Sequence, residues 1–159
     1  MREGDIVIEP TTAGDVEAVT GLIGRVFEEY GFVFDPATEL PDLLAFERHY
    51  GPPKGAFFVA RHGGQVVGSV GVERLSDSAA ELHRLYLDAD LRGRGLGRTL
   101  VETVLAWCRA AGPTHLVLWS DTRFDRAHVL YERMGFRRTG ERELQDVNHS
   151  REFRYERDT

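Results

Sequence analysis

Seven short stretches of the chain either alternate apolar with polar side chains or gather β-branched and aromatic residues. Both patterns are typical of strands that bury at least one face against a core. The stretches are residues 5–10, 56–61, 65–75, 80–87, 115–120, 136–144 and 151–157. Residues 62–64, with the sequence HGG, predict a hairpin between the second strand and the third. We therefore expect the three central strands to be antiparallel.

Apolar side chains recur at helical spacing in other parts of the chain. The helices predicted in this way span residues 16–30, 42–50, 95–112 and 126–134. Thr12 and Asp15 provide a helix start before the first of them, and Gly112 with Pro113 provides a stop after the third. Residues 31–41 are rich in turn formers, so this segment is expected to be less regular than its surroundings.

The predicted order is strand, two helices, three strands, helix, strand, helix and two strands. A strand–helix–strand crossover spans the glycine-rich residues 91–97. Such a crossover predicts one parallel strand pair inside an otherwise antiparallel sheet, with helices on its faces. Because the chain has no repeat, linker or low-complexity tract, we expect residues 1–159 to form a single mixed α/β domain.

Composition narrows the classes of function. Hydrophobic residues make up 42% and charged residues 29% of the 159, which is ordinary for a globular protein. A net charge of −6 argues against a nucleic-acid partner. Cys108 is the single cysteine, so neither an intramolecular disulfide nor a cysteine-ligated metal site is expected. With no secretory signal and no apolar run of membrane-spanning length, we expect a cytoplasmic protein without a membrane partner.

The stretch LRGRGLG, residues 91–97, connects a predicted strand to a predicted helix. A glycine-rich turn that opens a helix can bind phosphate, because the first N–H groups of the helix have no intrahelical partners. Arg92, Arg94 and Arg98 would add positive charge at this place. The alternative is a plain connection in which the glycines only turn the chain.

Two known phosphate loops do not fit this stretch. A P-loop needs Gly-Lys followed by Ser or Thr, but Arg98 and Thr99 follow Gly97. A dinucleotide fingerprint needs its third glycine three positions after the second, whereas Gly93, Gly95 and Gly97 alternate with other residues.

Two motifs in order carry a resemblance to a known family. Arg92, Gly95 and Gly97 form Arg-x-x-Gly-x-Gly, and a downstream Ala-x-x-Leu-Tyr-x-x-x-Gly-Phe element spans residues 127–136. With the order of elements over nearly the whole chain, these motifs resemble the GNAT superfamily of acyl-CoA-dependent N-acyltransferases. The resemblance implies acetyl-CoA (coenzyme A) as co-substrate and a GNAT-like sheet whose parallel strand pair lies at the cofactor loop.

The resemblance also implies the cofactor-binding residues. The loop that would bind the pyrophosphate through its backbone N–H groups comprises Arg92, Gly93, Arg94, Gly95, Leu96, Gly97 and Arg98. Gly95 and Gly97 are expected to be glycines because a Cβ would block the close approach of the backbone. The pantetheine arm would pair with the strand before the loop, at Leu85, Tyr86 and Leu87.

Three residues are candidates for proton transfer. Tyr131 lies at the family position of the tyrosine that donates a proton or hydrogen bond to the departing thiolate; otherwise it is an ordinary half-buried aromatic residue. Glu81 and His83 share one strand face and are candidates for the base that deprotonates the acceptor. The alternatives are a water relay as base, a surface role for Glu81 and a satisfied core histidine at position 83.

The chain departs from the family pattern at one position. Phe124 stands where the family often has asparagine, and Ser120, Asp121 or Asp125 are candidates to supply the missing contacts. His128 lies one turn before Tyr131 and either orients its hydroxyl or simply packs.

The segment from Val26 to Glu47 holds six carboxylates and no lysine or arginine. In this family the segment usually walls the acceptor site, so it favours a cationic amine, in a small molecule or a peptide; a solvated helix face is the alternative. The function expected is transfer of an acetyl group to a primary amine by direct attack in a ternary complex. The competing hypotheses are a non-catalytic acyl-CoA sensor or interaction module and a transferase for larger acyl groups or hydroxyl acceptors. A homodimer is expected only because family members are often dimers.

Overall fold

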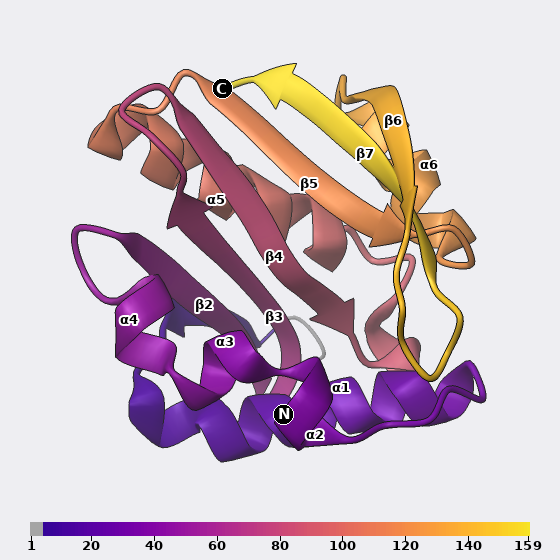
Figure 1. The fold of residues 1–159 in the computed structure, drawn as a ribbon. Helices are drawn as coiled ribbons and strands as arrows, with labels where there is room; N and C mark the ends of the chain where they lie inside the picture. Colours follow the sequence, from indigo (N-terminus) through magenta and orange to yellow (C-terminus); the bar gives the residue numbers. More distant parts are fainter. Residues whose placement is uncertain (1–4) are drawn as a thin grey trace.

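A computed structural model describes residues 5–159, in which seven strands form one sheet (Figure 1). The strands are β1 (Ile6–Pro10), β2 (Gly55–His62), β3 (Gln65–Arg74), β4 (Ala79–Leu87), β5 (His115–Asp121), β6 (Arg137–Glu143) and β7 (Arg151–Asp158). Their order in the sheet is β1-β2-β3-β4-β5-β7-β6. β4 and β5 pair in parallel, and the other neighbouring strands pair antiparallel. The predicted mixed sheet with one parallel pair is confirmed.

Helices cover both faces of this sheet. They are α1 (Val16–Glu29), α2 (Pro36–Glu39), α3 (Pro41–Leu44), α4 (Phe46–Tyr50), α5 (Leu96–Ala111) and α6 (Asp125–Arg133). Short 3-10 turns at Ala13–Asp15 and Ala89–Leu91 precede α1 and α5. Figure 1 shows α5 crossing behind the sheet, while α1 to α4 lie in front of it and below it.

The helices between α1 and β2 differ from the sequence prediction. The continuous helix predicted for residues 42–50 is broken at Ala45, whose backbone leaves the helical region with φ −115° and ψ 49°. The turn-rich segment 31–41 contains α2, because the Asp35 side chain accepts a hydrogen bond from the Ala37 N–H and Pro36 fits the first helical turn. These short helices are stabilised by packing rather than by their own periodicity, since Leu40, Leu43, Phe46 and Tyr50 are buried.

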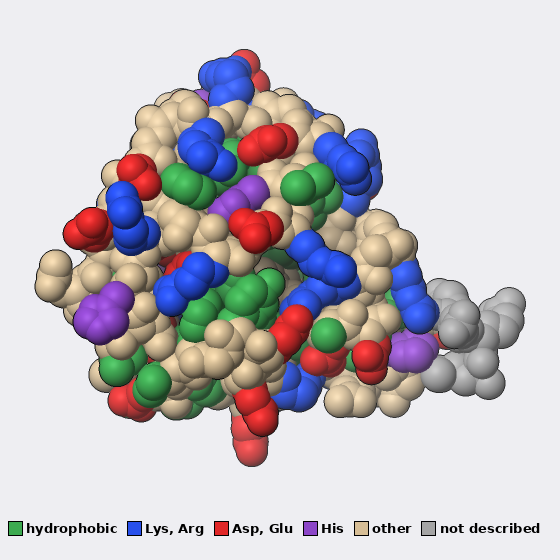
Figure 2. Space-filling view, turned by 90° about the vertical axis from the view of Figure 1, so that its right-hand side faces the viewer, with side chains coloured by type: hydrophobic (Ala, Val, Ile, Leu, Met, Phe, Trp, Pro, Cys, Tyr) green, Lys and Arg blue, Asp and Glu red, His purple; other side chains and the backbone are tan. Residues whose placement is uncertain are grey.

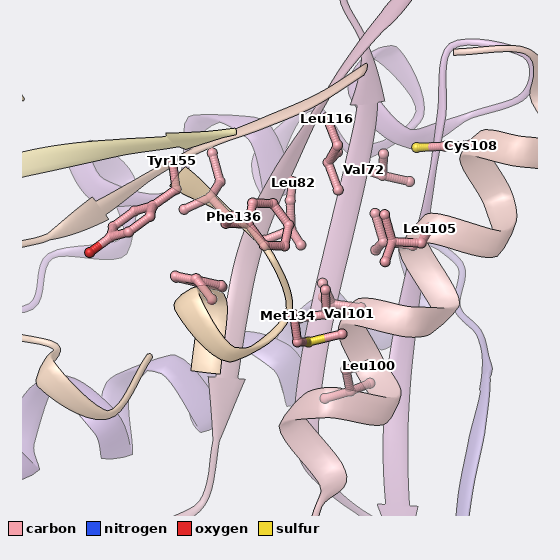
Figure 3. Packing of buried hydrophobic residues seen from close by; sticks show 14 of the residues in the cluster. Val72, Leu82, Leu100, Val101, Leu105, Cys108, Leu116, Met134, Phe136 and Tyr155 are labelled. Carbon is pink, nitrogen blue, oxygen red and sulfur yellow. The ribbon is translucent and has the colours of Figure 1, made fainter. Parts of the chain in front are cut away.

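The larger of two hydrophobic clusters lies between α5 and the sheet (Figure 3). Leu100, Leu105 and Cys108 from α5 meet Leu82 of β4 and Leu116 of β5 in this cluster. Burial raises the pKa of the Cys108 thiol to about 11, which suits a packing residue and not a nucleophile. A second cluster on the opposite face packs α1, α3 and α4 against β2 and β3.

β4 and β5 diverge soon after they begin. Their pairing is confined to residues 79–81 of β4 and 115–117 of β5, beyond which the strands separate (Figure 1). β4 also carries a bulge, because its partners on β3 change from His83 opposite Gly71 to Tyr86 opposite Ser69. At this bulge Arg84 has a φ of 55°, and its carbonyl accepts a hydrogen bond of 2.7 Å from the Ser69 hydroxyl. Because of this divergence, the main chain of β4 from Leu82 to Leu87 pairs with no strand of residues 5–159 on its β5 side.

Candidate active site

Two cavities, of about 520 and 500 Å³, lie beside the diverging ends of β4 and β5. We call the first the glycine-loop cavity, because Gly93, Gly95 and Gly97 line it, and the second the acidic cavity, because of its carboxylates. Four residues line both: Leu85, Tyr86, Phe124 and Ala127. The two cavities therefore meet where β4 and β5 separate.

The start of α5 forms one wall of the glycine-loop cavity. Gly93 and Gly95 have φ values of 78° and 82°, which only glycine adopts without strain, and no side chain caps the first turn of the helix. A Cβ at Gly97 would lie 3.2 Å from Leu130 and 3.3 Å from Leu87. A Cβ at Gly95 would meet no atom of the described protein within 4 Å, so within the fold it is the positive φ that favours glycine there. The expected close approach of a cofactor to the backbone at Gly95 and Gly97 stays a prediction.

Positive charge dominates the glycine-loop cavity. Its lining contains four arginines and, among the described residues, no aspartate or glutamate: Arg92, Arg98, Arg126 and Arg133. Figure 2 shows the right-hand side of the molecule, where hydrophobic side chains and charged side chains of both signs border a hollow. Arg92 pairs with Glu29 and donates a 2.9 Å hydrogen bond to the Leu87 carbonyl. Part of its hydrogen-bonding capacity therefore holds the end of β4 in place.

The predicted cofactor residues divide into two groups. The members that line the glycine-loop cavity are Leu85, Tyr86, Leu87, Arg92, Gly93, Gly95, Gly97 and Arg98. Arg94 and Leu96 do not line it, and Leu96 is buried in the core. Arg126 and Arg133 were not singled out from the sequence, although Arg126 lies about one helical turn before Val129 and Arg133 about one turn after Leu130, beside the second motif.

Carboxylates from distant segments gather in the acidic cavity. They are Glu39, Asp42, Glu73, Glu81, Asp121, Asp146 and Glu152. The cavity also contains two arginines, each paired with one of these acids: Arg84 with Asp42 at 2.7 Å and Arg142 with Glu152 at 2.6 Å. Burial, followed by the negative charge of Asp146, raises the pKa of Glu39. A cation near Glu39 and Asp146 would relieve this repulsion.

The acidic segment from Val26 to Glu47 supplies only two of these seven acids, Glu39 and Asp42. Glu29 lines neither cavity and pairs with Arg92 of the glycine-loop cavity, and the Asp35 side chain caps α2. Most of the negative charge instead comes from the strands and from the loop between β6 and β7. The sequence therefore predicted negative charge for the acceptor site, but five of the seven carboxylates of the acidic cavity lie outside the predicted segment.

Glu81 and His83 lie side by side in the acidic cavity, as their shared strand face predicts. The His83 Nε2 atom is 3.1 Å from the Glu81 carboxylate, and its Nδ1 atom is 3.1 Å from the Tyr50 hydroxyl. Glu73 is 3.8 Å from the same Nδ1 atom and also contacts His49 at 3.2 Å. Tyr50 and Glu73 were not singled out from the sequence, because only the folded chain brings them to His83.

Tyr131 lines the acidic cavity one helical turn after Ala127, which lines both cavities. The residue is 4% exposed, and its ring packs against Phe136 and Tyr155 with centroid distances of 5.6 Å. Burial, and then the neighbouring Tyr86 and Tyr155 hydroxyls, raise the pKa of Tyr131 above the ordinary value. Its phenol is therefore protonated at neutral pH and is available as a hydrogen-bond donor.

His128 does not orient Tyr131. Its Nε2 atom lies 3.2 Å from the Ser120 hydroxyl and 3.0 Å from the Asp121 carbonyl, which ties α6 to β5. Burial lowers the pKa of His128, so the ring is neutral at physiological pH. Of the two readings from sequence, the packing role matches its position.

Phe124 stands at the junction of the two cavities, in ring contact with Tyr30, Phe32 and Tyr86 at 4.8 to 6.4 Å. Ser120 and Asp121, two of the candidates to replace the missing asparagine, line the acidic cavity, whereas Asp125 lines neither cavity. The Ser120 hydroxyl is engaged with His128, and the Asp121 carboxylate is held by Arg123.

A clasp between two loops bounds the acidic cavity. The Asn148 side chain, between β6 and β7, accepts a 2.8 Å hydrogen bond from the Val33 N–H and donates one of 2.9 Å to the Val33 carbonyl. Arg123 adds to the clasp, because its guanidinium stacks 4.1 Å from the Phe32 ring and bonds the Asn148 carbonyl. We refer to these four residues as the Asn148 clasp.

Within residues 5–159, no three His, Cys, Asp or Glu side chains are placed to hold a metal ion together. The described helices include none that is long and apolar enough to cross a membrane.

Comparison with known proteins assigns a family to this arrangement. The family model described as the acetyltransferase (GNAT) family matches residues 23–136. N-acetyltransferase 8F1 of Rattus norvegicus is 37% identical over 129 residues, which cover 77% of this chain and 56% of that protein. N-acetylaspartate synthetase of Danio rerio is 38% identical over 104 residues, covering 64% of this chain and 37% of that protein. The chain thus spans about half or less of the length of these two relatives.

A bacterial relative and a solved structure match over more of their length. The uncharacterized N-acetyltransferase YjgM of Escherichia coli (strain K12) is 30% identical over 135 residues, which cover 82% of this chain and 81% of that protein. The crystal structure of an acetyltransferase from Streptococcus agalactiae 2603 superposes with a TM-score of 0.80 at 26% identity, covering 95% of this chain and 98% of that one.

Proposed function

The chain belongs to the GNAT acetyltransferase family, and from this premise we propose that it transfers an acetyl group from acetyl-CoA to a primary amine by direct attack in a ternary complex. The observation that carries the proposal is the meeting of two oppositely charged cavities at one opening in the sheet. One suits a polyanionic co-substrate, and the other suits an ammonium.

The residues of the glycine-loop cavity fit coenzyme A. The uncapped start of α5 offers backbone N–H groups to a pyrophosphate, and Arg98, Arg126 and Arg133 add positive charge. The apolar stretch from Leu85 to Leu87, with no strand partner on its β5 side, would pair with the pantetheine arm. When bound, acetyl-CoA supplies an activated thioester carbonyl.

The acceptor amine is deprotonated in the acidic cavity. We assign the base to Glu81, with His83 beside it at 3.1 Å. The ammonium N–H bond breaks, its electron pair stays on nitrogen, and the proton passes to the base. The nitrogen then attacks the carbonyl carbon. A backbone N–H at the open edge of β4 would stabilise the developing oxyanion.

Tyr131 completes the transfer. Its protonated phenol would donate to the departing sulfur as the carbon–sulfur bond breaks. The position of Tyr131 beside the junction residue Ala127 supports this assignment. Retention of a donor, Tyr131, and a base, Glu81, in the lining of the same cavity also favours an enzyme over a non-catalytic acyl-CoA-binding module.

The charge of the acidic cavity favours a cationic acceptor, such as a polyamine, an aminoglycoside or a basic peptide. Seven carboxylates face two arginines and two histidines there, and both arginines are already paired. The name of N-acetylaspartate synthetase indicates a product formed from an anionic amino acid. An unpaired arginine in the acidic cavity would favour such an acceptor in this protein. Arg84 and Arg142, however, are paired with Asp42 and Glu152.

The test is thiol release from acetyl-CoA by the purified protein with a panel of polyamines, aminoglycosides, basic peptides and amino acids. Release that depends on a cationic acceptor is the expected result. Release with aspartate or glutamate would contradict the proposed cationic acceptor class but would still support acetyltransferase activity. Binding of acetyl-CoA without release on any acceptor would favour the non-catalytic module.

A further inference from the structure

The hydroxyl of Tyr50 lies between two titratable side chains of the acidic cavity. It is 2.5 Å from the Asp42 carboxylate and 3.1 Å from the His83 Nδ1 atom. Tyr50 is 3% exposed and lines neither cavity, while Asp42 and His83 both line the acidic one. Tyr50 thus contacts His83 from the protein interior, outside the lining of the cavity.

The single hydroxyl hydrogen of Tyr50 has to serve one of these two partners. Burial alone would raise the pKa of Asp42, but the two hydrogen bonds and the charge of Arg84 hold it below its ordinary value. Asp42 is therefore an ionised carboxylate that only accepts. Burial, and then the charge of Asp42, raise the pKa of Tyr50, which stays a phenol. The shorter contact takes the hydrogen, so Tyr50 donates to Asp42.

The remaining contact fixes the proton on the His83 ring. With its hydrogen given to Asp42, the Tyr50 oxygen accepts, and so does the Glu73 carboxylate 3.8 Å from the same Nδ1 atom. Nδ1 must then carry a hydrogen. In the neutral ring Nε2 is left as an acceptor, and it faces the Glu81 carboxylate at 3.1 Å. Two acceptors at this distance repel each other until one proton lies between them.

We propose that Tyr50 is a positioning residue that holds His83 in the Nδ1–H tautomer, so that Nε2 and Glu81 jointly take up the proton of the acceptor ammonium. This inference rests on the proposed function. The proton leaves the ammonium nitrogen, is shared between Nε2 and the Glu81 oxygen, and passes to water after the acetylated product departs. No oxidant, metal or further co-reactant is involved.

Other charged groups near the pair are compatible with this assignment. Glu73 on β3 is itself contacted by His49 at 3.2 Å and by Lys54 at 3.5 Å, so it faces His83 as an acceptor whose charge is shared. Arg84, next to His83 on β4, is engaged by Asp42. The further charged groups that line the cavity are Glu39, Asp121, Arg142, Asp146 and Glu152.

Nitrogen NMR of the intact protein tests the tautomer without turnover. Uniformly ¹⁵N-labelled histidine distinguishes Nδ1–H from Nε2–H rings, and a His83→Gln variant identifies the His83 signals among those of six histidines. We expect neutral His83 to be Nδ1–H in the wild type and Nε2–H in Tyr50→Phe. The variant keeps the ring that packs on Phe46 and Phe57. An Nε2–H ring in the wild type, or the same tautomer in both proteins, would overturn the proposal.

The pH profile of kcat/KM provides the functional readout. Without the Tyr50 hydroxyl, neutral His83 can donate from Nε2 to Glu81, which stabilises the deprotonated pair. The acidic limb of the profile should then move to lower pH by about one unit, the equivalent of one hydrogen bond, with acetyl-CoA affinity unchanged. An unmoved limb would overturn the proposal. A tautomer switch in a protein inactive toward every amine would support the role of Tyr50 and contradict the proposed function alone.

Discussion

Asp42 on α3 and Arg84 on β4 form an ion pair through two hydrogen bonds, of 2.7 and 3.1 Å. Arg84 is the bulge residue with φ 55°, and its guanidinium also donates to the Glu39 carbonyl at 2.8 Å. The pair therefore joins the bulge of β4 to the short helices in front of the sheet. It positions the strand that lines both cavities.

Replacing Asp42 by asparagine should destabilise the protein. The Arg84 guanidinium would keep its mostly buried position without a countercharge, at a cost of about 2–4 kcal/mol. Urea unfolding at pH 7 measures this loss. Asp77→Asn, in an exposed loop, is the matched control and should be close to neutral. Equal midpoints for the two variants would show that the pair contributes nothing.

The same pair predicts how stability depends on pH. Because the pKa of Asp42 is lower in the folded than in the unfolded chain, its contribution is complete above the unfolded value and is lost as the pH falls through the folded one. Wild-type stability should therefore decrease below about pH 4. Asp42→Asn should show a shallower decrease in urea midpoint over that range. Parallel curves for wild type and variant would contradict the assignment.

Tyr131→Phe should lower kcat by roughly 10- to 100-fold, because the departing thiolate loses its donor. The phenylalanine ring keeps the contacts with Phe136 and Tyr155. Acetyl-CoA affinity, measured by calorimetry, should stay close to that of the wild type. Turnover equal to the wild type would remove Tyr131 from the mechanism.

Glycine substitutions separate backbone strain from cofactor binding. Gly95 and Gly64 have similar φ values, 82° and 83°, and a Cβ at either meets no described atom within 4 Å. Alanine at each should therefore cost a similar amount of stability, about 1 kcal/mol. Only Gly95→Ala should weaken acetyl-CoA binding, because it alone alters the start of α5. Equal affinity in the two variants would refute the role of the loop.

Glu81→Gln should reduce kcat/KM at neutral pH by about 100-fold through loss of the base. Glu17→Gln, on the exposed face of α1, is the control and should keep wild-type activity. If Glu81→Gln remains active and His83→Gln does not, His83 alone is the base. Activity in both variants would point to a water relay.

The β2–β3 hairpin and the long helices were predictable because their signals are local, whereas the β1–β2 and β5–β7 pairings join distant segments and were not predicted. α1, α5 and α6 each carry a buried face at helical spacing, and the hairpin glycines 63 and 64 mark the β2–β3 turn. The break at Ala45 was not predictable, since it depends on burying Leu43 and Phe46 against the sheet. The extent of the domain and the roles of the site residues stay predictions.

The glycine loop was recognisable because its residues are contiguous, whereas the acidic cavity was not. Glu73, Asp146 and Glu152 come from three segments, and only strand register brings them together. Tyr50 illustrates the same limit: its position in the chain says nothing of its contacts with Asp42 and His83. Residues that act through long-range contacts have no signature in one sequence.

The Asn148 clasp has a consequence for engineering. The two segments that it joins, residues 31–35 and 144–150, border the acidic cavity, and neither contributes a residue to the lining of the glycine-loop cavity. An engineer could exchange both segments together, keeping Asn148 and its hydrogen bonds to the Val33 main chain. Such an exchange would change the acceptor preference and leave the residues of the glycine-loop cavity unaltered.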